Sequence, residues 1–260
     1  MIMTIGCIIQ ARMGSSRLPG KVLRKLDDKN TVLDYVIDQI SNCKLIDKII
    51  VATTNLKEDD KIEVLTKNKN ILCFRGNPSD VLDRHYQCAK KFTFSTIVRI
   101  PSDKPLIDPQ IVDKVVEVFT TSEYDYVSNF LHYTFPYGTE VEVFSFKVLE
   151  KTWNLANLPS EREHVTPYIY NHRDKFKIFN VTNDEDLSHL RWEVDRNKDL
   201  ELVKILVKRI KNRPILLKHI LSLYQQEPSL FNINTSVNRS EGYLKSLKED
   251  EEFIKQNKHD

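Results

Sequence analysis

The stretch TIGCIIQARMGSSRLPGKVL, residues 4–23, joins an apolar run to a loop that is rich in glycine and in basic residues. Its first part, 4–10, predicts a short strand that is buried on both faces. The whole chain has six glycines, and two of them, Gly14 and Gly20, lie in this loop, which favours unusual backbone or close approach to a ligand. The ligand expected there is an anion, because the glycines are flanked by three cations: Arg12, Arg17 and Lys21.

Strand and helix patterns alternate outward from this loop. Strands are expected at 4–10, 48–53, 71–74, 96–100, 124–128, 140–144, 177–181 and 190–194. Helices are expected at 32–40, 59–66 and 80–91, from Pro109, after 145, around 163–171, at 200–210 and at 215–225. This rhythm is typical of an α/β fold in which helices cover both faces of a mostly parallel sheet.

The chain length fits one large domain with a small appendage. We expect a main domain at 1–213 and a C-terminal helix and polar tail at 214–260, with the tail loosely attached or partly helical and no motif that indicates its function. The net charge of +2 gives no signal for nucleic acid or an acidic membrane. No signal peptide or membrane span is expected, and the scattered cysteines favour reduced thiols, so we expect a cytoplasmic protein.

The loop does not fit the common phosphate-binding motifs. Five residues separate Gly14 from Gly20, and Val22 follows Lys21 where a P-loop needs a hydroxyl. The dinucleotide pattern G-x-G-x-x-G is absent as well. A loop after the first strand of a parallel sheet can still turn its backbone N–H groups toward a ligand at the carboxyl ends of the strands. A triphosphate is the ligand that this arrangement favours.

The segment QARMGSSRLPGKVL resembles the N-terminal signature of the cytidylyltransferases that make CMP-activated sugars, of the CMP-sialate and CMP-ketodeoxyoctonate synthetase type, and above all their spore-coat polysaccharide branch. Further segments match this branch in order: FRGNPSDVLDRHY (74–86), RIPSDKPLIDP (99–109), FPYGTEVEVFS (135–145), SEREHVTPYIY (160–170) and LRWEVDRNKDLELV (190–203). The resemblance covers 4–210 and implies a Rossmann-like nucleotidyltransferase fold, CTP, Mg²⁺, a homodimer, and an acceptor and dimerisation region at about 124–190.

The resemblance also implies roles for individual residues. The acceptor oxygen attacks the α-phosphate of CTP and pyrophosphate leaves, which requires positioning and charge stabilisation. The catalytic residues implied are Arg12, Lys21 and Asp103. The nucleotide-binding residues implied are Ala11, Arg12, Gly14, Ser15, Lys21, Arg75, Gly76, Asp80 and Asp103. Within these sets, Asp80 is equally a helix cap, and Arg17 either contacts phosphate or anchors the loop.

Two aspartates are expected to hold the metal ion. Asp103 and Asp195 each follow a predicted strand, so both should lie at the carboxyl edge of the sheet. An aspartate in that place is more often a cap or turn residue, but the resemblance assigns both to Mg²⁺, which prefers oxygen ligands. A shared ion requires the two carboxylates to lie within about 8 Å of each other.

The acceptor region is expected beyond the metal pair. Glu140 and Glu142 fall on one face of a strand, where carboxylates suit sugar hydroxyls. Arg162 and His164 are further acceptor candidates, although each is also compatible with an ordinary helix end, as is the neighbouring Glu163. The aromatic segment 130–137 is a candidate dimer arm.

The predicted function is CTP-dependent transfer of CMP to a sugar acid or related small acceptor for surface-glycan biosynthesis. One alternative is a nucleotide-sugar-dependent glycosyltransferase, which would normally show an Asp-x-Asp motif after a strand. Another is a non-catalytic nucleotide-binding protein, in which the loop cations or the aspartate pair should be lost. The acceptor stays open among a nine-carbon acidic sugar, another keto-sugar acid, and a phosphorylated or phosphonate small molecule.

Overall fold

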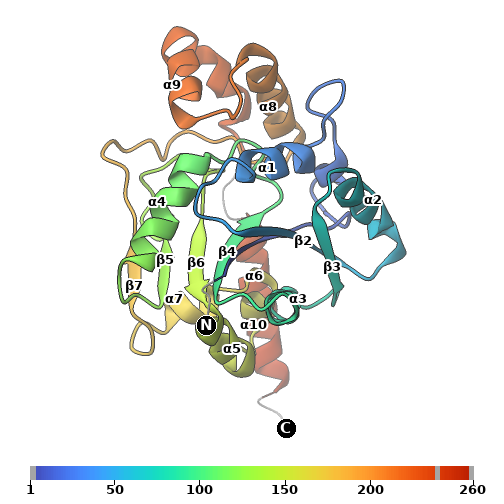
Figure 1. The fold of residues 1–260 in the computed structure, drawn as a ribbon, viewed down its shortest axis with the longest axis vertical. Coiled ribbons are helices and arrows are strands. Elements are labelled where there is room, and N and C mark those ends of the chain that lie inside the picture. Colours follow the sequence, from blue (N-terminus) through green and yellow to red (C-terminus); the bar gives the residue numbers. More distant parts are fainter. Residues whose placement is uncertain (1–3, 238–240, 258–260) are drawn as a thin grey trace.

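Seven strands form one sheet in the order β3-β2-β1-β4-β6-β5-β7 in the computed structural model, which describes residues 4–237 and 241–257 (Figure 1). Neighbouring strands are parallel, except that β6 runs antiparallel to β4 and β5. The strands are β1 (Ile5–Gln10), β2 (Lys48–Thr54), β3 (Leu72–Gly76), β4 (Thr96–Pro101), β5 (Tyr126–Ser128), β6 (Glu142–Ser145) and β7 (Ile178–Asn180). The expected α/β class with a mostly parallel sheet is confirmed.

Helices cover both faces of this sheet (Figure 1). The α-helices are α1 (Val32–Ile40), α2 (Asp60–Asn68), α3 (Val81–Lys91), α4 (Pro109–Thr120), α5 (Phe146–Leu155), α6 (Pro159–His164), α7 (Pro167–Asn171), α8 (Asn197–Arg209), α9 (Leu217–Gln226) and α10 (Glu241–Gln256). Three 3₁₀ turns accompany them: η1 (Lys21–Leu23), η2 (Lys57–Asp59) and η3 (Pro228–Asn234).

The apolar run at the start of the chain forms a central strand, β1, that is buried on both faces. Cys7 and Ile9 pack with α1 and α4 on one face, while Ile8 packs with α3 and α5 on the other. This division follows from the strand geometry, because successive side chains point to opposite faces. Both neighbours of β1 run parallel to it, so the loops after β1 and β4 leave the same edge of the sheet.

Two predicted elements differ in the structure. Residues 190–194 were expected as a strand, and this prediction is wrong: the segment makes an isolated bridge to Tyr137, which lies in a loop and offers no ladder to extend. The helix expected around 163–171 is divided into α6 and α7. The division falls where Val165 has a left-handed backbone (φ 73°) and Pro167 disfavours a helical residue before it.

The C-terminal part of the chain packs onto the main sheet domain. Helices α8 and α9 and turn η3 share a third apolar cluster with Leu18 of the first loop and with Trp192. Helix α10, in the second half of the predicted polar tail, packs against α6. The tail was expected to be loosely attached or partly helical; over residues 241–256 it is helical and packed against α6.

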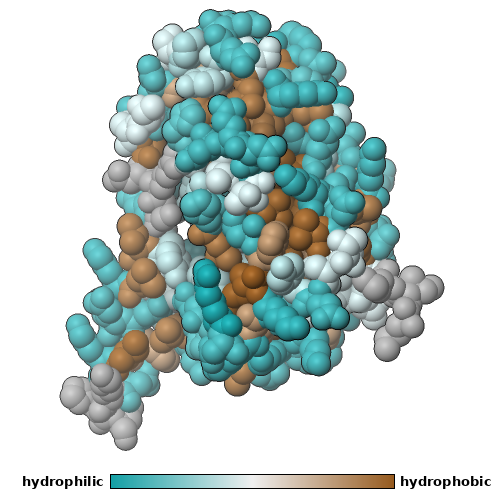
Figure 2. All heavy atoms as spheres, turned by 90° about the vertical axis from the view of Figure 1, so that its left-hand side faces the viewer, coloured by the Kyte–Doolittle hydropathy of each residue, from teal (hydrophilic) through white to brown (hydrophobic). Residues whose placement is uncertain are grey.

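The surface shows no long apolar band on the face that carries β7 and α4. Hydrophilic residues predominate there, and hydrophobic residues gather in patches between them (Figure 2). Over residues 4–237 and 241–257, none of the helices has the length and apolar character needed to cross a membrane.

A buried histidine in α3 predicts a pH-dependent stability. His85 is inaccessible to solvent, and burial, together with Arg99, lowers its pKa from 6.5 to about 3. Below pH 6.5 the unfolded chain therefore binds a proton that the folded chain does not take up until about pH 3. Stability from this group should be complete above pH 6.5 and fall as the pH drops toward 3, by up to roughly 1.4 kcal/mol per pH unit.

Urea unfolding between pH 7 and 4 measures this effect. His85→Leu should flatten the pH dependence by most of that slope, whereas the control His132→Gln, at an exposed histidine, should leave it unchanged. Parallel curves for wild type and His85→Leu would show that His85 does not titrate differently in the two states.

Candidate functional site

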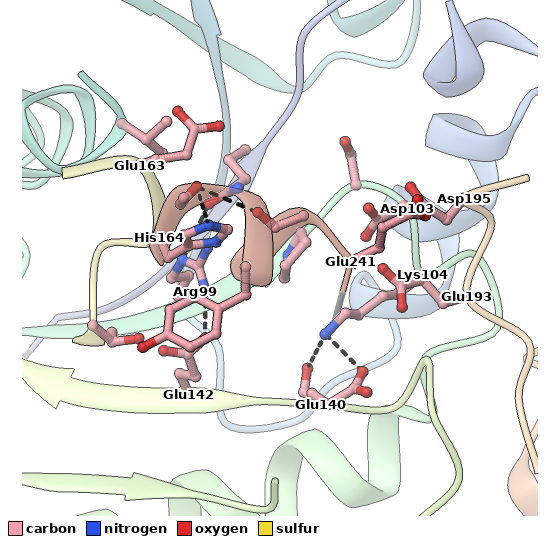
Figure 3. Close-up of a pocket in the computed structure, with 18 of the residues that line it drawn as sticks. Arg99, Asp103, Lys104, Glu140, Glu142, Glu163, His164, Glu193, Asp195 and Glu241 are labelled. Atoms are coloured by element: carbon pink, nitrogen blue, oxygen red, sulfur yellow. Dashed lines mark hydrogen bonds and ion pairs between the residues drawn. The ribbon is translucent and has the colours of Figure 1, made fainter. Parts of the chain in front are cut away.

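A pocket of about 1380 Å³ lies at the edge of the sheet where β1 and β4 end (Figure 3). Gln10 and Pro101 pair at the ends of these strands, and Ser102 N–H donates to the Gln10 carbonyl oxygen (3.1 Å). The loop after β1 and the turn after β4 therefore leave side by side. This volume is large enough for a nucleotide together with a second small substrate.

Hydrogen bonds within the glycine-rich loop and to Asp59 fix the backbone of the loop. The Met13 carbonyl oxygen accepts from the N–H groups of Ser15 (2.9 Å) and Gly20 (3.0 Å), and Met13 N–H donates to Asp59 Oδ1 (2.7 Å). Gly20 has φ 66°, a left-handed conformation that glycine adopts without strain. Leu18 is buried under the loop. The loop is thus a preformed turn.

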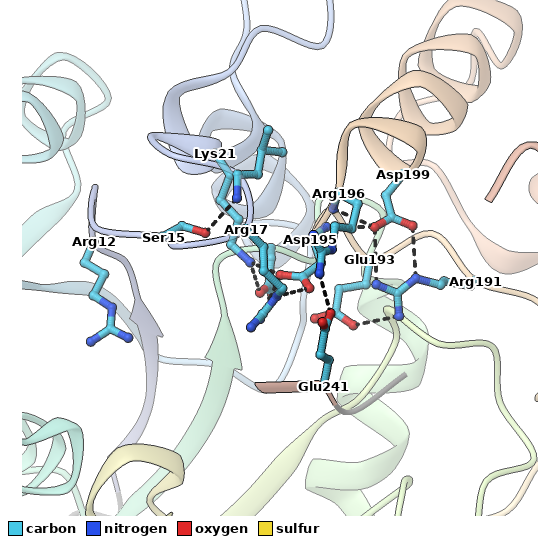
Figure 4. Close-up of polar contacts among 12 residues, drawn as sticks. Arg12, Ser15, Arg17, Lys21, Arg191, Glu193, Asp195, Arg196, Asp199 and Glu241 are labelled. Carbon is cyan, nitrogen blue, oxygen red and sulfur yellow. Dashed lines mark hydrogen bonds and ion pairs between the residues drawn. The ribbon is translucent and has the colours of Figure 1, made fainter. Parts of the chain in front are cut away.

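A compact charge cluster joins this loop to Asp195, shown in Figure 4, and to Asp103, which lies beside Asp195 in Figure 3. Lys21 Nζ lies 2.7 Å from Asp103 Oδ2 and 3.0 Å from Asp195 Oδ1, and Arg17 Nη2 donates to the same Asp195 oxygen (3.0 Å). Both carboxylates reach one nitrogen atom, so they meet the expected limit of about 8 Å for sharing an ion. Although 190–194 is no strand, Val194 N–H donates to the Asp103 carbonyl oxygen (2.7 Å), which brings Asp195 beside Asp103.

The cations keep both carboxylates ionised. Burial raises the pKa of Asp103, but Lys21 and Lys104 outweigh it and leave the pKa below its ordinary value. Burial also raises the pKa of Asp195. The hydrogen bond from Arg17 and the charge of Lys21 outweigh this effect and lower the pKa to about 2. The site therefore presents two carboxylates to the pocket near neutral pH.

This carboxylate pair fits a small divalent cation. Asp103 Oδ1 is buried and has no hydrogen-bond partner among the described residues, and carboxylate oxygens are the ligands that Mg²⁺ prefers. In the described part of the chain, no group of three or more His, Cys, Asp or Glu residues is arranged to hold a metal. An ion at this pair would have to complete its shell with substrate oxygens and water.

Two more cations, Arg12 and Arg84, line the pocket. Arg12 pairs with Glu163 of α6 at 2.5 Å, and both side chains are partly exposed; such a pair is worth only about 0.2–1 kcal/mol and can be exchanged for a phosphate. Arg84 is 1 % exposed, and its guanidinium donates to the Asn77 carbonyl oxygen (2.7 Å). None of the ion pairs among the described residues includes Arg84. An anionic or oxygen-rich ligand would therefore compensate the buried charge of its guanidinium group.

Arg84 was missed by the sequence reasoning, although it lies in the FRGNPSDVLDRHY segment. The signal was its position four residues after Asp80, which places both on one side of α3. Asp80 caps this helix by accepting from Asp83 N–H (2.8 Å) and also accepts from Arg162 Nε (2.9 Å). Burial, followed by the charge of Arg12, lowers the pKa of Arg84 to about 10, so it is still a cation at neutral pH.

Three residues predicted to bind the nucleotide lie outside the pocket lining: Arg75, Gly76 and Asp80. Arg75 is held by Asp60, Glu63 and the backbone oxygens of Thr54 and Leu56. Gly76 lies beside Arg84. The remaining predicted nucleotide residues line the pocket: Ala11, Arg12, Gly14, Ser15, Lys21 and Asp103.

Two buried ion pairs also line the pocket (Figure 3). Lys104 Nζ lies 2.7 Å from Glu140 Oε2, and Arg99 pairs with Glu142. Both predicted acceptor carboxylates thus line the pocket while held in place. Glu193, missed by the sequence reasoning because its side-chain direction was unknown, faces the same space.

Two titratable groups that line the pocket have strongly shifted pKa values, Glu193 and His164. Burial, then the charges of Asp103 and Glu140, raise the pKa of Glu193 to about 8. The predicted Arg162 and His164 also line the pocket from α6. Burial, then Arg99, Arg12 and Arg17, lower the pKa of His164 to about 4, so its imidazole is neutral at pH 7.

A family model, two curated relatives and a solved structure each match most of this chain. A family model described as cytidylyltransferase matches residues 6–238. An uncharacterized protein of Methanocaldococcus jannaschii is 39% identical over 94% of this chain and 98% of its own length. The spore coat polysaccharide biosynthesis protein SpsF of Bacillus subtilis is 30% identical over 85% of this chain and 94% of its own. The solved structure of a cytidylyltransferase from Leptospira borgpetersenii is 33% identical, with a TM-score of 0.85, and covers 88% of this chain and 97% of that one.

Proposed function

Because the chain belongs to the cytidylyltransferase family, we propose that it transfers CMP from CTP to a sugar acid or related small acceptor, releases pyrophosphate, and uses Mg²⁺. Surface-glycan biosynthesis is the proposed setting, in line with the spore-coat relative. The observation that carries the proposal is the contact of one loop lysine, Lys21, with two carboxylates, Asp103 and Asp195, at the mouth of a preformed glycine-rich turn.

The reaction breaks one P–O bond and forms another. An acceptor oxygen attacks the α-phosphorus, the bond to the β-phosphate oxygen breaks, and the acceptor proton is released. Backbone N–H groups of the loop, together with Arg12 and Lys21, would hold the β- and γ-phosphates and stabilise the charge on the leaving pyrophosphate. Lys21 is suited to this task because its flexible stem can turn its ammonium group from the carboxylates to the phosphates.

Asp103 and Asp195 would hold the metal ion, which when bound would withdraw charge from the phosphate oxygens. Their own part is to fix its position against the loop. Glu193 faces the acceptor end of the same pocket, and a pKa of about 8 makes its carboxylate a candidate to take the acceptor proton. Glu140 and Glu142, held by Lys104 and Arg99, would accept hydrogen bonds from acceptor hydroxyls.

Thermal unfolding with each of the four nucleoside triphosphates and Mg²⁺ tests the nucleotide. CTP at a hundredfold excess over its dissociation constant should raise the free energy of unfolding by about 2.7 kcal/mol. ATP, GTP and UTP should raise it less. The control is CTP without a divalent ion, which should stabilise less. Equal stabilisation by ATP and CTP would contradict the assignment to cytidylyl transfer.

Pyrophosphate release tests the acceptor. The panel should contain a nine-carbon acidic sugar, a keto-deoxy sugar acid, and phosphorylated or phosphonate small molecules.

We also propose that the protein is a homodimer, with the aromatic segment 130–137 as an arm. Phe130, Tyr133 and Tyr137 of this segment line the pocket, so such an arm would connect the interface to the acceptor site.

A further inference from the structure

Helix α10 forms a wall of the pocket although the matched family region ends at residue 238. Six of its residues line the pocket: Glu241, Gly242, Tyr243, Lys245, Ser246 and Glu249. Figure 3 shows Glu241 on the same side of the pocket as Asp103 and Asp195. The helix thus reaches the space that the proposed reaction uses.

Residues of α10 contact both the charge cluster around Asp195 and helix α6. Glu241 pairs with Arg196 at 2.6 Å, next to Asp195, and a Cβ on Gly242 would lie 3.2 Å from the guanidinium of Arg17. Tyr243 packs edge-on against His164, with ring centroids 5.2 Å apart. The first turns of α10 therefore lie against the charge cluster at one end and against α6 at the other.

Two buried polar side chains attach the helix to α6. Ser246 Oγ shares a hydrogen bond with His164 Nε2 (3.1 Å), and Asp250 Oδ1 accepts from Ser160 N–H (2.8 Å). Ser246 and Asp250 are 5% and 6% exposed. The large aliphatic residues of α10 and Phe253 are themselves exposed: Leu244, Leu247, Phe253 and Ile254.

These four side chains are not buried by the contact with α6, whereas an ordinary amphipathic helix buries its apolar side. Attachment through polar groups gains little net free energy, because each hydrogen bond replaces one to water. A helix held in this way and lining a large pocket gains further stability from any ligand that contacts it.

We propose that α10 is part of the substrate-binding surface, and that binding of a nucleoside triphosphate and docking of α10 stabilise each other. We place α10 beside the phosphates of the nucleotide because its first turn contacts Arg17 and Arg196, which lie next to Asp195. By linkage, docking of α10 raises the affinity for the nucleotide by the same factor by which the nucleotide raises the docking equilibrium of α10. This inference rests on the proposed function for the identity of the nucleotide.

Amide hydrogen exchange on the full chain, with and without CTP and Mg²⁺, tests the coupling. Saturating CTP should slow exchange in α10 by at least about threefold, in addition to slowing it in the loop 11–21. Protection of the loop with no change in α10 would overturn this inference and leave the proposed function standing. Absence of protection throughout the chain would overturn the proposed function, and this inference with it.

A matched pair of variants provides the second readout. Ser246→Ala removes the hydrogen bond to His164 and should weaken CTP binding by about three- to tenfold, the worth of one hydrogen bond. Lys248→Ala changes an exposed position on the same helix and should bind CTP like the wild type. Calorimetric titration with CTP and Mg²⁺ measures both, and equal affinities in wild type and Ser246→Ala would overturn the coupling.

Discussion

Lys21→Met should lower turnover by roughly 10²-fold or more, because one cation opposite the leaving phosphates is lost. Methionine keeps the length and the apolar stem of lysine, so the turn around Gly20 and the packing of Leu18 should be preserved. The measurement is pyrophosphate release with CTP and with whichever panel acceptor the wild-type protein uses best. Thermal unfolding of the same sample checks that the fold is intact.

The same substitution should have the opposite effect on metal affinity. Lys21 neutralises both Asp103 and Asp195, so without it two neighbouring carboxylates repel each other and attract a divalent cation more strongly. Titration with Mn²⁺ in the absence of nucleotide should therefore show tighter binding than in the wild type. A variant that had merely unfolded would lose both properties.

Lys25→Met is the matched control, because Lys25 is exposed and follows the same loop. It should keep wild-type turnover and wild-type Mn²⁺ affinity. Normal turnover of Lys21→Met would mean that Lys21 serves only to neutralise the two aspartates.

Much of the fold was predictable because its signals are local. The apolar run 4–10, the cap residue Asp80 before α3 and Pro109 at the start of α4 act within a few positions of themselves, so their elements follow from short-range patterns. The placement of Asp103 was predictable for a related reason: a residue just after a parallel strand lies at the carboxyl edge wherever the strand sits.

Other features depend on packing between distant segments. Residues 190–194 have the apolar pattern of a strand, but their neighbour is the loop around Tyr137, and no pattern within the segment reveals its partner. Glu193 became a site candidate only when its side-chain direction was known, and the burial of Arg84 was not visible in its spacing from Asp80. Helix α10 buries Ser246 and exposes Leu244, against the rule by which sequence periodicity assigns a buried face.

Asp103→Asn should abolish most of the activity, by roughly 10²-fold or more, since an amide keeps the shape of the side chain but removes a hard anionic metal ligand. Asp195→Asn should do the same. Its fold must be checked separately by thermal unfolding, because Asp195 also accepts from Arg17. The surface variant Asp184→Asn, at an exposed carboxylate, should be fully active.

The double variant Asp103→Asn/Asp195→Asn distinguishes a shared ion from two separate roles. If both carboxylates act through one ion, removing either disables the same function, so the second substitution should add much less than the first. Two independent roles would instead multiply the losses. Mn²⁺ affinity measured with bound CTP should fall in each single variant and hardly further in the double. Full multiplication of the losses, with Mn²⁺ affinity unchanged, would contradict the shared-ion mechanism even though each aspartate mattered for turnover.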